Sequence, residues 1–231
     1  MRHIHKFLIN KRIDKKIDQN VHKYFPVSRI ELIKNIKELL NQGEHNLNCI
    51  DTSKIVDMNG LFYNIDISQS YSINVSEWDV SNVRDMSGMF NGCKNFNCDI
   101  SNWDVSNVEN MTSMFGECNK FNCNISNWDV SNVTNMKDMF YMCESFNQDI
   151  SNWNVSKVRC MTGMFYDCVD FNQDISNWNV SKVKEMVSMF SCCEKFNYDL
   201  SKWTPKKCID FSDMFYNCKA LNIIPDWYTY C

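Results

Sequence analysis

A tryptophan recurs every 25 residues through most of this 231-residue chain. The series comprises Trp78, Trp103, Trp128, Trp153, Trp178 and Trp203. The positions between these tryptophans repeat in the same register, with a Met-Phe pair, a Cys and an Asn in each unit. A weaker copy of the unit, from Ile50 to Phe62, precedes them. A fixed period of this length indicates a chain built from repeated structural units, which constrains the fold more than any single motif does.

The repeat predicts a solenoid. Apolar positions within each unit are spaced mostly by two and three residues, which fits neither a heptad pattern nor one long helix. A unit this small cannot bury its own apolar side, so equivalent positions of neighbouring units must stack into one core. We expect a short strand at Asp-Ile-Ser-Asn-Trp, a second extended piece at Val-x-x-Met, and one helical or 3₁₀ turn at Met-Phe-x-x-Cys. The expected fold is an α/β repeat solenoid of about seven coils.

The chain has only six Gly and three Pro, so Asn, Asp and Ser must make its turns. Ser28-Arg29-Ile30-Glu31 is a capping box, which predicts a helix over 29–41 that covers the open end of the first coil. The predicted organisation is a basic N-terminal extension (1–27), a helical cap (28–48), the repeat solenoid (49–226) and a C-terminal tail (227–231). Ile13, Ile17, Val21 and Tyr24 indicate an amphipathic helix in the extension, which either contacts an anionic partner or, as we favour, is simply solvated.

One unit carries a family resemblance. It reads Trp128-Asp129-Val130-Ser131-Asn132-Val133-Thr134-Asn135-Met136, then Met139-Phe140, then Phe146-Asn147-Gln148-Asp149-Ile150-Ser151. This resembles the repeat of the BspA-like leucine-rich-repeat surface proteins of mycoplasmas, other bacteria, protists and some large DNA viruses. The resemblance covers roughly residues 30 to 225. It implies a right-handed, leucine-rich-repeat-like solenoid without enzymatic activity, associated with adhesion and protein binding.

The cysteines of the repeat fall in one register. They are Cys93, Cys118, Cys143, Cys168, Cys193 and Cys218. Zinc sites usually take two ligands from one short loop such as CxxC, and the chain has no CxxC. We interpret the six residues as a ladder of buried free thiols. The alternatives are disulfides between neighbouring coils in an oxidising compartment, and a metal site made by Cys93 and Cys98 with Cys118 and Cys123.

Polar residues repeat as strictly as the apolar ones. One Asn is present in every full unit: Asn97, Asn122, Asn147, Asn172, Asn197 and Asn222. We interpret them as an inward ladder that satisfies backbone groups at a corner of each coil and bonds the Asn above and below. Acidic registers such as that of Asp99 and Asp149 are interpreted as turn caps in preference to a calcium-binding edge. The Trp and Met-Phe columns are interpreted as core in preference to a ligand platform.

Several classes of function are disfavoured. Residues 1–48 carry ten Lys/Arg against five Asp/Glu, whereas 49–231 carry fourteen against twenty-three, so the acidic body argues against a nucleic-acid footprint. All four His lie in the first 45 residues, and no phosphate-loop, dinucleotide-binding or zinc-protease motif is present. We therefore expect no enzyme, cofactor or small-molecule substrate. No apolar run approaches the roughly 20 residues of a membrane span.

The sequence also predicts where the protein is found and in what state. The apolar run Phe7-Leu8-Ile9 is too short for a secretion signal, so we expect an intracellular protein, in a virion or host-cell cytoplasm if the source is a virus. Because caps are predicted at both ends, a monomer is expected.

Two registers vary from coil to coil and are the candidate partner-binding positions. The first contains Arg84, Glu109, Arg159 and Lys184, and the second contains Tyr141, Tyr166 and Tyr216. Tyr at a variable surface position is a common interface anchor. We predict a nonenzymatic protein–protein interaction scaffold with an unidentified protein partner. The alternative is a surface or virion structural or adhesion protein that engages a receptor or glycan, and such an exported protein should have few free thiols.

Overall fold

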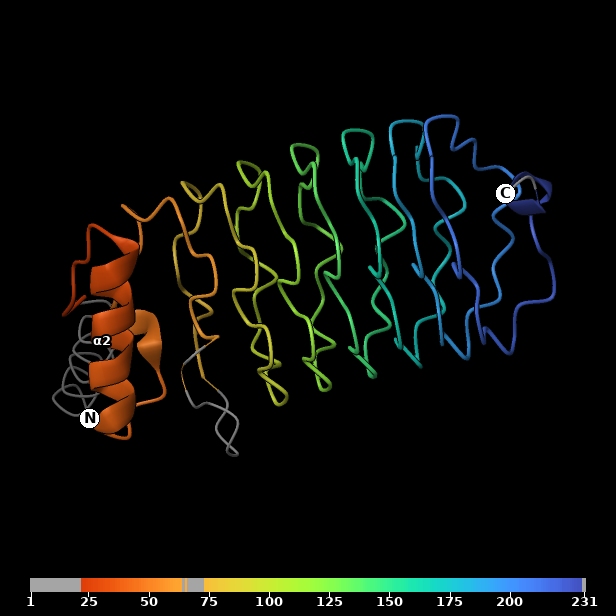
Figure 1. Ribbon diagram of the computed structural model, residues 1–231. Helices are drawn as coiled ribbons and strands as arrows, with labels where there is room; N and C mark the ends of the chain where they lie inside the picture. Colours follow the sequence, from red (N-terminus) through yellow and green to blue (C-terminus); the bar gives the residue numbers. More distant parts are fainter. Residues whose placement is uncertain (1–21, 64, 66–72, 230–231) are drawn as a thin grey trace, which may run out of the picture.

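The computed structural model describes residues 22–63, 65 and 73–229. Successive segments of the chain lie side by side as coils in one row, with helix α2 at one end and the C-terminal coil at the other (Figure 1). The helices are α2 (Arg29–Asn41) and the 3₁₀ helices η1 (Leu47–Cys49) and η2 (Asp226–Thr229). The amphipathic helix predicted in the extension lies, apart from Tyr24, outside the described residues.

The coils turn where an Asp or Asn side chain accepts a hydrogen bond from the backbone amide two residues further on, and the coils that begin at Trp78, Trp103 and Trp128 each have three such turns. In the coil that begins at Trp128, the pairs are Asp129 with Ser131 (3.0 Å), Asn135 with Lys137 (3.0 Å) and Asp149 with Ser151 (2.9 Å). In these turns a side-chain oxygen replaces a backbone acceptor, so little Gly or Pro is needed. The predicted turn chemistry is confirmed, and the acidic registers act as turn caps.

The coils are held together by alternate amides of the segment that contains the Met-Phe pair. The amides of Met136, Asp138, Phe140 and Met142 donate to carbonyls of the next coil at 2.7 to 3.0 Å. The amides between them close turns within their own coil, as Cys143 does with the carbonyl of Phe140 at 2.9 Å. A helical turn would direct all these amides along its own axis, so it could not bond the next coil.

This alternation needs residues in the left-handed region. Asp138 has φ 53° and Met142 has φ 57°, and the equivalent positions of the other coils are also positive. Gly occupies some of these positions, such as Gly88 and Gly163, but most hold other residues at a cost of about 1 kcal/mol each. The segment is therefore a chain of linked turns, and the single helical or 3₁₀ turn predicted there is not formed.

In the described residues, extended backbone of neighbouring coils pairs only through isolated parallel bridges. One such series joins Asp57, Asp85, Asn110, Asn135, Cys160, Glu185 and Asp210, each to the next, and a further bridge joins Asn46 to Asn74. The part of the chain that the structure describes has no strand, so the short strand predicted at Asp-Ile-Ser-Asn-Trp is wrong. The physical reason is the Asx turn, because Asp149 takes the amide of Ser151 that a strand ladder would need.

The core consists of the columns that the repeat predicts. Trp153 is 4% exposed, and the side chains of Phe140 and Met139 are fully buried. The phenylalanine rings stack from coil to coil, with the centroids of Phe115 and Phe140 5.7 Å apart and those of Phe140 and Phe165 also 5.7 Å apart. The interpretation of the Trp and Met-Phe columns as core is confirmed.

Each tryptophan also satisfies a backbone group of the preceding coil. The Nε1–H of Trp153 donates to the carbonyl of Ile125 at 3.1 Å, and the other tryptophans of the series repeat this bond. Trp227 does the same to Leu200 at 3.0 Å and stacks on Trp203, so the row of coils extends past the predicted boundary at residue 226.

Helix α2 covers the first coil. Its bounds are those predicted, and the Ser28 hydroxyl accepts from the Glu31 amide while the Glu31 carboxylate accepts from the Val27 amide. Leu32, Ile36 and Leu39 face the core. Arg29 donates its Nε–H to the carbonyl of Asn59. This carbonyl faces away from the second coil, toward the end of the row that helix α2 covers. Before the helix, Tyr24 forms a parallel bridge with Ile50, so the end of the predicted extension lies against the first coil.

Replacing Trp153 by Phe should destabilise the fold. The substitution keeps an aromatic ring but removes the Nε1–H donor, so the Ile125 carbonyl keeps only its bond from the Trp128 amide. We expect the free energy of unfolding to fall by about 1 kcal/mol in a urea titration followed by circular dichroism. The matched control, Trp227→Phe, should lose less because that side chain is only half-buried. Equal losses would contradict the role assigned to the bond.

The turn caps predict a dependence of stability on pH. Hydrogen bonds from the serine two residues on lower the pKa of Asp149, Asp174 and Asp199. A carboxyl whose folded pKa lies below its unfolded value of about 4 stabilises the fold above that pH, and the contribution disappears as the pH falls through the folded pKa.

Replacing these three aspartates by Asn should therefore flatten the loss of stability below about pH 4. Stability at neutral pH should change little, because Asn124 already caps the same turn through its own side-chain oxygen. Thermal unfolding measured across the acid range checks this prediction. A variant whose melting temperature falls as steeply as that of the wild type would refute it.

Candidate interaction surface

Two columns of side chains run across the coils on their outer surface. The asparagine–lysine column consists of Asn82, Asn107, Asn132, Lys157, Lys182 and Lys207. The arginine column, two residues further on, consists of Arg84, Glu109, Thr134, Arg159, Lys184 and Ile209. The valine between them, such as Val133, is fully buried, so the residues on either side of it face solvent. Backbone bonds such as Thr134 N–H to the Glu109 carbonyl (2.9 Å) hold the arginine column in register.

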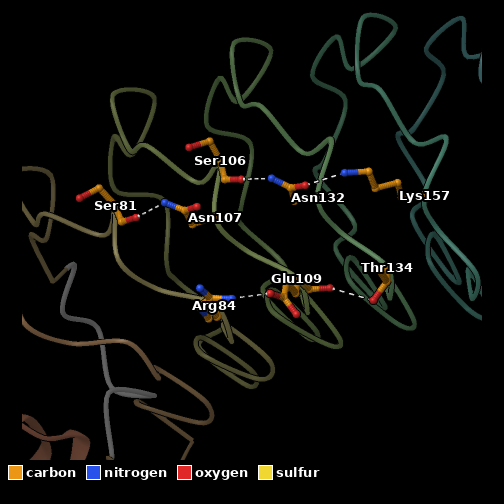
Figure 2. A network of polar contacts seen from close by, with 8 residues as sticks. All are labelled: Ser81, Arg84, Ser106, Asn107, Glu109, Asn132, Thr134 and Lys157. Carbon is orange, nitrogen blue, oxygen red and sulfur yellow. Dashed lines mark hydrogen bonds and ion pairs between the residues drawn. The ribbon is translucent and has the colours of Figure 1, made fainter.

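In the N-terminal coils the charges of the arginine column are paired. Arg84 Nη1 lies 2.8 Å from Glu109 Oε1, and the Thr134 hydroxyl donates to the Glu109 carbonyl at 3.2 Å (Figure 2). The two charged side chains are 70% and 56% exposed, so this ion pair contributes at most about 1 kcal/mol to stability. The structure thus places two of the predicted partner-binding residues, Arg84 and Glu109, in contact with each other.

In the same coils the asparagines bond the preceding coil. The side-chain amide of Asn107 donates to the Ser81 carbonyl at 2.8 Å, and that of Asn132 donates to the Ser106 carbonyl at 2.7 Å (Figure 2). The next residue of the column is Lys157, whose ammonium donates to Asn132 Oδ1 at 2.7 Å (Figure 2). The side chains of this half of the column therefore serve the fold.

The C-terminal coils carry a different set of charges. We define the basic cluster as the exposed residues Lys157, Arg159, Lys182, Lys184, Lys206 and Lys207. Among the described residues the ion pairs are Arg84–Glu109, Lys195–Asp170 and Lys219–Glu194, and none includes the cluster. Like charges on neighbouring coils repel one another.

Sequence reasoning singled out Arg159 and Lys184 but missed the four other cations of the basic cluster. The signal in the sequence was the change from Asn to Lys along the asparagine–lysine column, which begins at Lys157.

The three candidate tyrosines do not form one group. Tyr141 and Tyr166 are half-buried and stack with ring centroids 5.0 Å apart and planes 16° from parallel. Tyr216 is 66% exposed, and the coil between it and Tyr166 has the buried Ser191 in this register. The structure therefore joins two of the tyrosines and leaves the third apart.

Carboxylates surround the stacked pair. Burial raises the pKa of Tyr141, and the nearby Tyr166, Asp138 and Glu117 add to the rise. Burial also raises the pKa of Asp138 and of Asp167, the latter helped by the charges of Glu144 and Glu194. The surface around the tyrosines is thus acidic, in contrast to the basic cluster.

The cysteine ladder lies inside the coils. Five of its members are buried and Cys218 is half-buried. From Cys118 onward each thiol donates to the carbonyl of the Phe 28 residues earlier, as Cys143 does to Phe115 at 2.9 Å. Burial raises the pKa of the Cys93 and Cys218 thiols to about 12, and raises those of the four members between them well above the ordinary value. The ladder is a set of neutral donors.

The alternative metal site draws on two different columns. Cys98 and Cys123 do not belong to the ladder, and their sulfurs accept from the amides of Val75 and Ile100 at 3.5 Å. No group of three or more His, Cys, Asp or Glu in the described residues is arranged to hold a metal ion. All twelve described cysteines are free thiols.

The asparagine ladder runs along the outside of the coils. The amide of Asn122 donates to Asn97 Oδ1 at 2.9 Å, and the same bond repeats to Asn147, Asn172, Asn197 and Asn222 at 2.9 to 3.2 Å. The predicted Asn-to-Asn contact is therefore present, but the predicted inward orientation is wrong, because five of these residues are exposed and Asn172 is half-buried. The preceding Phe, such as Phe121, fills the interior, so the next side chain points outward.

Cys192 and Cys193 form a matched pair for a reactivity test. Cys193 belongs to the buried ladder, and its raised pKa leaves little thiolate at pH 8, whereas the adjacent Cys192 is half-buried. We expect iodoacetamide to modify Cys192 in the native protein and to spare Cys193, with both modified in denaturant. Mass spectrometry of the peptide reports the two sites together. Equal modification of both in the native state would contradict the buried ladder.

A protein-family model described as "Mycoplasma protein of unknown function, DUF285" matches residues 30–148 and 118–228. The two matches together cover most of the chain, so the protein belongs to this family. The result agrees, at the level of the family, with the resemblance found in the repeat. No curated protein and no solved structure matches the chain. Within the described residues, no helix has the length and apolar character needed to cross a membrane.

Proposed function

We propose that the protein is a leucine-rich-repeat-type solenoid that acts as a nonenzymatic scaffold for binding another protein. The observation that carries the proposal is the stacked pair of Tyr141 and Tyr166 in a register that varies between coils. Each residue with an identical type in every coil has a role in the core, a turn or a bond between coils. The variable registers are not held to one residue type by these roles, so they are the positions that can be adapted to a partner.

The tyrosine pair has the properties of an interface anchor. Tyr brings a large contact area and a hydroxyl with only two side-chain torsions to fix on binding. Here each ring already packs against the other, so part of the entropy cost is met in the free protein. The backbone beneath them is held by the bonds from Phe140 and Met142 to the next coil, at 3.0 and 2.7 Å. The pair therefore offers a preorganised surface.

Replacing both Tyr141 and Tyr166 by Ala should weaken binding of the protein partner. Loss of two anchors should reduce affinity by more than about tenfold without changing the circular-dichroism spectrum. The experiment is affinity capture from the native cellular context with quantitative mass spectrometry. The matched control, Tyr63→Ala with Tyr198→Ala, removes two exposed tyrosines that lie in other coils than the stacked pair and should retain the partner.

The outcomes of the capture experiment separate the two function classes. A partner retained by the wild type and the control, and lost by the Tyr141 and Tyr166 variant, supports the scaffold. A partner retained equally by all three proteins rejects the tyrosine pair as the anchor. If no protein is enriched and a glycan array retains the chain instead, the adhesion alternative replaces the scaffold.

A further inference from the structure

We infer that the basic cluster binds an acidic segment of a protein partner, and that Ile209 receives an apolar side chain of that segment. The inference rests on the proposed scaffold function and names the chemistry of the partner. It concerns the last three coils, where the asparagine–lysine column and the arginine column both become cationic.

The lysines of the cluster stand where the fold would favour Asn. In the earlier coils Asn82, Asn107 and Asn132 each donate to a serine carbonyl of the preceding coil at 2.7 to 2.8 Å. Lys157 instead reaches the side chain of Asn132, and no such bond forms at Lys182 or Lys207 within the described residues. At Lys182 and Lys207 the change gives up a bond between coils, and at all three positions it adds repulsion between like charges. A departure from the repeat that does not help the fold indicates a binding role.

The cations of the cluster are available to a ligand. The nearest carboxylates along the chain are Glu185 and Asp210, which accept from the Cys160 thiol and from the Ser212 amide and hydroxyl, and these two negative charges leave the six cations in excess. Within the part of the chain that the structure describes, no ion pair involves the six cations. The cluster therefore presents six exposed positive charges on three adjacent coils.

The neighbouring residues favour a peptide over a nucleic acid. The two columns contain no aromatic side chain on which a base could stack. Ile209 is 78% exposed and its amide bonds the carbonyl of Lys184, so an apolar side chain lies directly beside the cations. A peptide segment with carboxylates on both sides of an apolar residue matches this combination of cations and an exposed isoleucine. The acidic character of the rest of the solenoid would also repel a long polyanion.

The test uses the full chain and a fluorescein-labelled peptide in which glutamates flank a single leucine. The variant Lys157→Asn, Lys182→Asn, Lys207→Asn restores the residue that the earlier coils have, so it should fold. We expect it to bind the peptide at least about tenfold more weakly in fluorescence anisotropy, with a reduced dependence on salt. Ile209→Ser should weaken binding about threefold or more, and only for the peptide that contains leucine.

The control variant Lys54→Asn, Lys120→Asn, Lys137→Asn removes the same charge from exposed positions outside the cluster and should bind like the wild type. Equal weakening of both triple variants would overturn the site, because net charge alone would then explain binding. No measurable binding of the peptide by the wild type would also overturn it. Tighter binding of single-stranded RNA than of the peptide would overturn the class of partner.

The inference and the scaffold can fail separately. If the wild type captures a protein through Tyr141 and Tyr166 but does not bind the acidic peptide, the basic cluster loses its role and the scaffold stands. If the peptide binds at the cluster and no protein is captured, the scaffold assignment fails while the anionic site remains. The Tyr141→Ala, Tyr166→Ala variant should bind the peptide as the wild type does.

Discussion

The structure depends on hydrogen bonds from each coil to the next at a fixed separation along the sequence. Alternate amides of the Met-Phe segment donate forward, while the amides of the arginine column donate backward. Trp and Cys side chains add bonds to carbonyls 28 residues earlier. Because each coil has only an isolated bridge with its neighbour, these side-chain donors replace much of what a sheet ladder would supply. The identity of Trp and Cys in every full coil follows from this bonding as well as from packing.

The structural roles of the inward and corner residues explain where the chain can vary. Inward residues fill a core of stacked aromatic rings, and the Asp, Asn and Ser of the corners close the turns. The residues left over lie on the outer surface, and there the coils differ in charge and in aromatic content. The basic cluster and the acidic surroundings of Tyr141 are both built by changing only these positions. The outer surface can therefore change from coil to coil without a cost to the core.

Much of the fold could be predicted from the sequence because each structural position holds the same type of residue in several coils. The bounds of helix α2, the buried Trp and Phe columns and the Asx turns follow from local chemistry. The linked turns could not be predicted, since residues such as Met142 have no intrinsic preference for positive φ and adopt it only to bond the next coil. The outward asparagines were mistaken for buried ones because strict repetition fits either orientation. At the surface, Arg84 and Glu109 are one period apart, so the register brings them side by side, but the sequence does not fix the side-chain torsions that join them.

The constant separation of the bonded residues has a consequence for how such a chain can change in length. Within the regular coils, every bond between neighbours joins residues whose distance along the chain is set by the 25-residue period. Duplication or deletion of one whole unit at the level of the gene would recreate the same junction, since the new neighbours present the same donors and acceptors. The number of coils is therefore free to drift by recombination.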